Sequence, residues 1–213
     1  FTRSEMMVME MLSTNEWKRP MYFAVTIGND YHLGLDPYLE LTGMAYRITP
    51  ERSKDGKPRV NTEVMYDNML HKFKYGNMNI PGIYIDENTM RMCRTHRMMF
   101  CQLAEALYDE GKYDKALEVL DFAEEVLPGY NVNYDYTSGT MAALYYAMDE
   151  MEKGNAIMAV LADNCVEYME WGASLSAPER KAAQSTLGHY SAVLGFVLNN
   201  LQRFEQKELF NKY

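Results

Sequence analysis

The fold is decided by the stretch from Phe100 to Pro128, which reads FCQLAEALYDEGKYDKALEVLDFAEEVLP. Leucines at positions 103 and 107 form one apolar helical face, Gly111 interrupts it, and a second apolar face continues through Leu120. Pro128 ends the second helix because proline lacks the amide hydrogen that a helix needs. Both faces carry small side chains that let antiparallel helices approach closely: Ala104, Ala116 and Ala123. The stretch therefore predicts a helix hairpin that turns at Gly111.

This hairpin has the spacing of a tetratricopeptide repeat. The matching positions are Phe100, Leu103, Ala104, Leu107, Gly111, Ala116, Leu120, Ala123 and Pro128. A second unit is less regular, because Ala156 corresponds to Ala116 but Leu144 stands where a small residue is expected. We therefore expect two tetratricopeptide-like hairpins and a closing helix, which are too few for a full superhelix.

The helical signal extends from Asp86 to the end of the chain. Apolar residues at helical spacing between positions 142 and 161 predict the second helix pair. Ser176-Ala177-Pro178-Glu179 is a capping box that opens a long helix reaching Leu201. Residues 83–213 are therefore expected to form one helical domain.

Residues 1–82 mix helix and strand signals and predict a small α+β segment. Strands are indicated at 21–27, which is rich in aromatic and β-branched residues, and at 44–49, where apolar and polar residues alternate. An opening helix ends before Pro20, because proline disfavours a helical conformation in its predecessor. The apolar face expected on that helix consists of Met6, Met7, Met11 and Leu12.

Two further short helices are expected in this segment. Asp36-Pro37 would open one that carries Leu39 and Leu41, and Asn61 or Thr62 would cap the other. Taken together, the signals predict a mostly α, α+β chain with about two strands near its N-terminus.

Composition and charge exclude several classes of protein. Hydrophobic residues make up 47% and charged residues 24%, as in folded globular chains. No apolar run approaches the roughly 18–20 residues that span a bilayer, so we expect a soluble chain. The net charge of −9 lies within residues 96–213, since residues 1–95 are balanced. Binding to nucleic acid and direct adsorption of this acidic part to an anionic membrane are therefore not expected.

No sequence motif demands catalysis, and no cofactor is expected. Phosphate-binding glycine loops, dinucleotide fingerprints, paired-cysteine metal spacings and the HExxH and GxSxG motifs are all missing from the sequence. Buried free thiols are expected for Cys93, Cys101 and Cys165. Cys93 and Cys101 would lie about 12 Å apart along one helix, too far for a disulfide.

The densest group of polar side chains follows the first predicted strand and consists of Asn29, Asp30, His32 and Asp36. If Asp30, His32 and Asp36 converged, they would form a metal or general-base site of a hydrolase. A simple turn is the interpretation we favour, because Asn and Asp commonly bend chains. On the closing helix, Ser185 and His189 lie one turn apart but have no orienting acid, so a packing role is expected for His189.

One cluster combines cationic and aromatic residues, namely Trp17-Lys18-Arg19. Packing of the first helix onto the strand is the interpretation we favour. If the chain follows a membrane span, the cluster would instead contact lipid headgroups or a lipid-phosphate donor. A second cluster favours a helical core over an adaptable binding groove: Met90, Met92, Met98 and Met99.

Tetratricopeptide arrays use the first helix of each pair to line a concave face. In this chain such a face would suit a peptide or a sugar, although solvated helix faces look the same in sequence. It would consist of Cys101, Glu105, Tyr108, Ser138, Met141 and Tyr145.

Four segments carry a more particular resemblance: Trp17-Lys18-Arg19-Pro20-Met21-Tyr22-Phe23-Ala24, Gly28-Asn29-Asp30, Leu41-Thr42-Gly43-Met44-Ala45-Tyr46-Arg47 and Met65-Tyr66-Asp67-Asn68. They resemble the soluble C-terminal region of a Bacteroidetes membrane-protein family that is similar to protein O-mannosyltransferases. The similarity runs over nearly the whole chain. It implies a non-catalytic domain on the periplasmic face of the inner membrane, because the catalytic acid of such enzymes lies in their membrane part.

Three functional hypotheses follow. The first is an interaction domain of a membrane-bound glycosyltransferase, tethered through an upstream segment and binding an acceptor protein or another partner. The start at Phe1 rather than Met favours a piece of a longer protein. The second is a free-standing helical scaffold that binds a protein segment. The third is a metal-dependent hydrolase with a site at Asp30 and His32.

Overall fold

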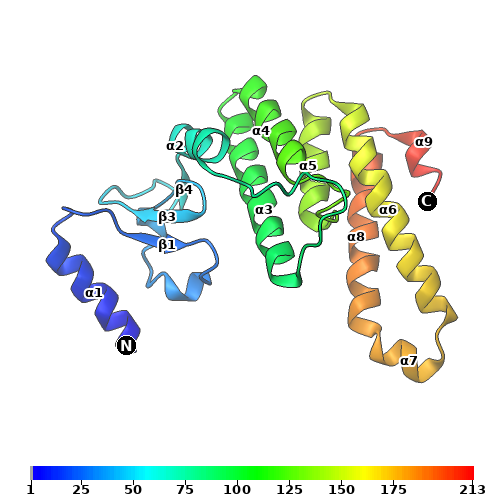
Figure 1. Ribbon diagram of the computed structural model, residues 1–213, viewed down its shortest axis with the longest axis horizontal. Coiled ribbons are helices and arrows are strands. Elements are labelled where there is room, and N and C mark those ends of the chain that lie inside the picture. The colour runs from blue at the N-terminus through cyan, green and yellow to red at the C-terminus, as the bar shows by residue number, and fades with distance from the viewer. Residues whose placement is uncertain (1) are drawn as a thin grey trace. The chain divides into compact units, whose positions relative to one another are not determined.

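The computed structural model describes residues 2–213, and the contacts divide the chain into two units, one ending at Lys74 and the other beginning at Tyr75. The first unit contains a small sheet and the second is helical (Figure 1). The predicted fold class, α+β with mostly helix, is confirmed. Among the described residues, none of the helices combines the length and the hydropathy that a membrane span requires.

A four-stranded sheet organises the first unit. Its strands are β1 (Tyr22–Ala24), β2 (Leu39–Leu41), β3 (Ala45–Ile48) and β4 (Arg59–Val60). They lie in the order β1-β3-β2-β4, with β3 antiparallel to both of its neighbours and β4 parallel to β2. Phe23, Leu39 and Ile48 form a buried cluster, against which Val8 and Leu12 of helix α1 (Arg3–Asn15) pack.

Short helical turns complete this unit. They are 3-10 helices at Asn29–Tyr31 and Asp36–Tyr38, helix α2 (Thr62–Asp67) and a π-helical turn at Asn68–Lys72. Asn61 caps α2, since its side-chain oxygen accepts a hydrogen bond from the Val64 amide at 3.1 Å. The Asn68 side chain donates to the Thr42 carbonyl at 2.7 Å, which ties the π turn to the end of β2.

The structure corrects the predicted strands of this unit. β1 covers three residues of the predicted 21–27, because Val25 and Thr26 turn and the Ile27 amide bonds to the Ala24 carbonyl at 3.0 Å. Leu39 and Leu41 belong to strand β2 rather than to a helix, because the 3-10 helix ends before them and β2 pairs with two neighbours. The sheet therefore has four strands instead of about two.

The predicted apolar face of α1 is wrong in all but one residue. Leu12 packs on the core together with Val8, whereas Met6, Met7 and Met11 are between 48% and 60% exposed. The residue at position 8 lies one turn before Leu12 and on the same side of the helix, so it turns the packed face away from the methionines.

Two helix hairpins, a further long helix and two short helices form the second unit. The helices are α3 (Glu87–Asp109), α4 (Tyr113–Val126), α5 (Tyr136–Ala147), α6 (Met151–Ser174), α7 (Ala177–Ala182), α8 (Gln184–Arg203) and α9 (Lys207–Phe210). Helix α3 packs on α4 and on α5, α5 packs on α6, and α8 runs along α6 (Figure 1). The predicted order of hairpin, hairpin and closing helix is thus confirmed.

Local sequence explains where these helices begin and turn. The Asp86 carboxylate caps α3 by accepting hydrogen bonds from the Asn88 and Thr89 amides. Gly111 has a φ of 75° in the turn between α3 and α4, a conformation that favours glycine. The capping box at Ser176 is present, but the predicted long helix divides at Ala183 into α7 and α8. Arg180 donates to three carbonyls at the end of α6 and so holds α7 against it.

The residues just before α3 pack on the helical unit. The ring of Tyr75 lies within 6 Å of the rings of Phe100 and Phe122. The Asn131 side chain donates to the Met78 and Ile80 carbonyls, each at 2.7 Å. Residues 75–82, which the sequence pattern groups with the N-terminal segment, therefore belong by contact to the second unit.

Arg97 of α3 is fully buried and holds the connection between α4 and α5. One guanidinium nitrogen donates to the carbonyls of Leu127 (2.7 Å) and Val132 (2.8 Å). The other donates to the Asn133 carbonyl and to the Ser138 hydroxyl, both at 3.2 Å. Four hydrogen bonds from one side chain thus fix the course of this connection.

Two further side chains surround this guanidinium. The ring of Tyr134 faces it at 5.3 Å, and the Tyr134 hydroxyl donates to the Glu124 carboxylate at 2.6 Å. Burial raises the pKa of Glu124, although the bond from Tyr134 and the charge of Arg97 act in the opposite direction. We refer to Arg97, Glu124, Tyr134 and Ser138 as the Arg97 cluster.

Candidate functional site

Most of the residues predicted to line a concave surface are buried in the structure. Glu105 is exposed and Tyr108 is half-buried, but the other four residues are buried: Cys101, Ser138, Met141 and Tyr145. The reason is that α3 and α5 pack directly on each other, so the helix faces that carry these residues meet neighbouring helices. Those four side chains cannot line an open partner-binding face.

Trp17-Lys18-Arg19 forms an exposed turn after α1. Glu16 and Trp17 have φ values of 47° and 59°, in the left-handed region. The Asn15 side chain closes the turn by donating to the Arg19 carbonyl (2.7 Å) and accepting from the Arg19 amide (3.2 Å). Trp17 is 56% exposed, so packing of the first helix onto the strand buries less than half of this residue's surface.

His32 and Asp36 meet, but Asp30 does not join them. The Nδ1 atom of the buried His32 lies 2.8 Å from the Asp36 carboxylate, and its ring packs near Phe23 and Tyr46. Burial, and secondarily the charge of Asp36, raise the pKa of Tyr46. Among the described residues no group of three His, Cys, Asp or Glu side chains has the geometry to hold a metal ion. The contact therefore ties the two 3-10 turns to the sheet.

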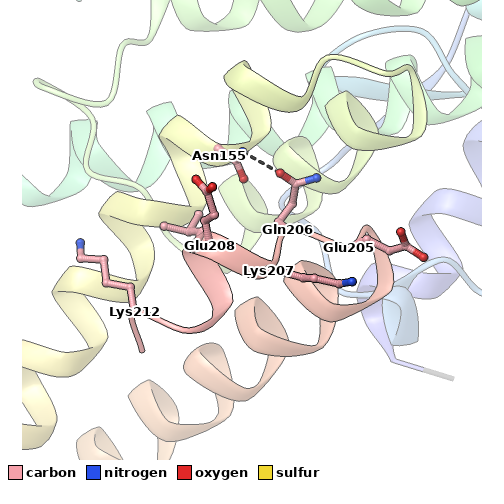
Figure 2. A pocket seen from close by; sticks show the side chains of 7 residues that line it. Asn155, Glu205, Gln206, Lys207, Glu208 and Lys212 are labelled. Carbon is pink, nitrogen blue, oxygen red and sulfur yellow. Dashed lines mark hydrogen bonds between the residues drawn. The ribbon is translucent and has the colours of Figure 1, made fainter.

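An open pocket of about 550 Å³ lies where α9 folds back on α6. Figure 2 shows the Asn155 and Gln206 side chains meeting at its wall, and they form a hydrogen bond of 2.8 Å. The charged side chains around it, among them Lys207 and Glu208, extend in different directions and do not converge on a common point (Figure 2). This arrangement joins α9 to α6 and offers no focused binding chemistry.

A smaller pocket of about 240 Å³ is the stronger candidate, and we call it the α6–α8 pocket. Helix α6 contributes one face at helical spacing, and α8 contributes the facing wall. The wall residues are Leu161, Asn164, Cys165 and Tyr168 from α6 and His189, Tyr190 and Val193 from α8. Arg94 of α3 and residues 133–136 complete the lining.

The walls of the pocket combine an apolar base with aromatic side chains. Leu161, Cys165 and Val193 are buried. The rings of Tyr168 and Tyr190 stack with their centroids 3.7 Å apart and nearly parallel. Burial, together with a hydrogen bond to Tyr168, raises the pKa of Tyr190 to about 12, and its protonated hydroxyl can both donate and accept hydrogen bonds.

The Arg97 cluster positions the acidic side of the pocket. Asp135 follows the carbonyls that Arg97 holds and caps α5, where one carboxylate oxygen accepts a bond from the Ser138 amide at 3.3 Å. Its other carboxylate oxygen lies 3.7 Å from Nε of Arg94, a loose ion pair. The carboxylate and the guanidinium are therefore held at the pocket with much of their hydrogen-bonding capacity unused.

His189 is the residue of this pocket that the sequence pattern offers as a candidate, and a packing role is expected for it. The structure leaves His189 exposed at the pocket, beside the ring of Tyr190. Asn164, Tyr168 and Asp135 were not identified. The pattern available was the spacing of Leu161, Asn164, Cys165 and Tyr168, which places polar and aromatic residues on an otherwise apolar helix face.

A comparison with known protein families matches the first part of the chain. A family model described as TMEM260-associated domain 2 matches residues 1–68, which include the whole sheet of the first unit. No similar curated protein and no similar solved structure was found. The match falls on the segments whose motifs resemble the membrane-protein family similar to protein O-mannosyltransferases, and it agrees with that resemblance.

Proposed function

We propose that this chain is a non-catalytic extramembrane domain of a membrane-bound protein similar to glycosyltransferases, and that it binds or positions an acceptor protein or another partner. The observation that carries the proposal is the match of residues 1–68 to the TMEM260-associated domain 2 model. TMEM260 is described as similar to protein O-mannosyltransferases. The motifs between Trp17 and Asn68, which lie within the same residues, resemble the same kind of membrane protein.

In this proposal the two units have different tasks. The first unit joins the domain to the membrane part, with the exposed Trp17-Lys18-Arg19 turn near lipid headgroups or the lipid-phosphate donor. The second unit, built of tetratricopeptide-like hairpins, faces the partner. Following the family resemblance, we place both units on the periplasmic face of the inner membrane.

The direct test is an immunoblot of fractionated cells of the source organism with an antibody raised against this domain. We expect a band far above 24.7 kDa in the membrane pellet, resistant to an alkaline carbonate wash. Protease added to spheroplasts should degrade the epitope if the domain faces the periplasm. A soluble band near 24.7 kDa would contradict the proposal and leave the free-standing scaffold as the explanation.

A further inference from the structure

The α6–α8 pocket presents several polar groups whose hydrogen-bonding capacity is not fully used within the described part of the chain. No hydrogen bond joins the half-buried Asn164 amide or the His189 imidazole to another described residue. Arg94 and Asp135 approach each other only to 3.7 Å. Groups of this kind at the wall of a pocket remain available to a ligand that supplies matching donors and acceptors.

The balance of charge selects a neutral ligand. An anion would be attracted by Arg94 but would meet the Asp135 carboxylate beside it. A cation would meet the Arg94 guanidinium. A purely apolar ligand would cover the Asn164 amide and leave it without a partner, which costs free energy. A ligand without net charge remains, and one with several groups that both donate and accept hydrogen bonds would also satisfy the Asn164 amide.

The size and the aromatic lining narrow this class to a small ring. At about 240 Å³ the pocket lies below the roughly 300–1,000 Å³ of sites for drug-sized molecules. Tyr136 and Tyr168, which are 51% and 38% exposed, supply flat carbon surface at its edge. A pyranose ring combines a face of C–H groups, which suits such a surface, with hydroxyls that donate and accept.

We propose that the α6–α8 pocket binds one neutral sugar ring, either a free monosaccharide or the terminal residue of a glycan. The Asn164 amide and the Asp135 carboxylate bond to the ring hydroxyls, and the tyrosines cover the C–H face. This inference goes beyond the proposed function. It concerns residues outside the 1–68 match and does not depend on attachment to a membrane.

The test is calorimetric titration of the full 213-residue chain with methyl glycosides of the common hexoses and N-acetylhexosamines, and with oligosaccharides that end in the same residues. Asn164→Leu keeps the volume of the side chain and removes its hydrogen bonds, so affinity should fall about tenfold. Asn199→Leu is the matched control, because Asn199 is exposed on α8 and does not line the pocket.

A second pair of variants tests the aromatic surface. Tyr168→Ala should weaken binding, whereas Tyr84→Ala, at a side chain that is 91% exposed and outside the pocket, should not. Binding of the methyl glycosides would identify a monosaccharide site, and binding of oligosaccharides alone would identify a glycan end. The proposal is overturned if no sugar binds. It is also overturned if Asn164→Leu and Tyr168→Ala bind sugar as well as their control variants do, or if peptides bind this pocket and sugars do not.

Discussion

Two polar regions of the helical unit share the connection between α4 and α5, and they differ in how their polar groups are satisfied. In the Arg97 cluster, one buried guanidinium makes four hydrogen bonds within the protein. In the α6–α8 pocket, Arg94 lies three residues earlier on the same helix but forms only a loose ion pair. The comparison separates polar groups that hold the fold from polar groups that are free to hold a ligand.

The largest effect is expected for Arg97→Met. The substitution removes four donors and leaves the carbonyls of Leu127 and Val132 buried without partners, which should cost about 3–5 kcal/mol of unfolding free energy. Urea unfolding followed by circular dichroism measures this change. Arg94→Met is the matched control and should stay within about 0.5 kcal/mol. Equal effects of the two substitutions would remove the distinction between the regions.

A pH-dependent effect is expected for Glu124→Gln. Because burial raises the pKa of Glu124 in the folded state, its protonated form favours folding. That contribution is fully present below the unfolded pKa of about 4.3 and is lost as the pH rises through the raised folded pKa. Glutamine resembles the protonated form, so the variant should gain stability relative to the wild type between about pH 4 and pH 7, by at most about 1.4 kcal/mol per pH unit. Urea unfolding at both pH values tests this, and a constant difference would argue against a raised pKa.

A small effect on stability is expected for Asn164→Leu. The Asn164 amide bonds to no other described residue, so its loss should change the unfolding free energy by less than about 0.5 kcal/mol. The same urea experiment measures it, with Asn199→Leu alongside. A loss comparable to that of Arg97→Met would show that Asn164 supports the fold instead of standing ready for a ligand.

Thiol labelling compares the Arg97 cluster and the α6–α8 pocket in the chain without any substitution. Cys101 lies one turn after Arg97, and burial raises its pKa to about 12, so almost no thiolate forms in mildly alkaline buffer. Cys165 is also buried, but it lines the pocket. Iodoacetamide followed by mass spectrometry should therefore modify Cys165 before Cys101. The reverse order would indicate that the Arg97 region opens more readily than the pocket.

Much of the helical unit could be predicted because its signals are local. Asp86, Gly111 and the capping box at Ser176 act within a few residues, and each is found where the sequence indicates. Leu39 and Leu41 were misassigned because a three-residue strand is too short to show a period, and its pairing with β3 and β4 is decided by distant residues.

The candidate site could not be predicted for the same physical reason. Its polar side chains lie on three helices and a connecting segment, and only packing brings Arg94, Asp135 and Asn164 together. The buried state of Arg97 was also missed, because an arginine is normally exposed and its acceptors lie at least 30 residues away in sequence. Cys101, Ser138 and Tyr145 are expected on a surface but are buried in the structure. Sequence spacing identifies a helix face, but it does not identify the elements that cover that face.

The most direct test of the account is one nuclear magnetic resonance titration of the full chain with the sugar that binds best. The side-chain amide of Asn164 and the guanidinium Nε–H of Arg97 report on the two regions in the same spectrum. We predict that the Asn164 signal shifts with increasing sugar concentration while the Arg97 signal stays in place. An unmoved Asn164 signal, or equal shifts at both side chains, would contradict the division between a region that holds the fold and a pocket that binds a ligand.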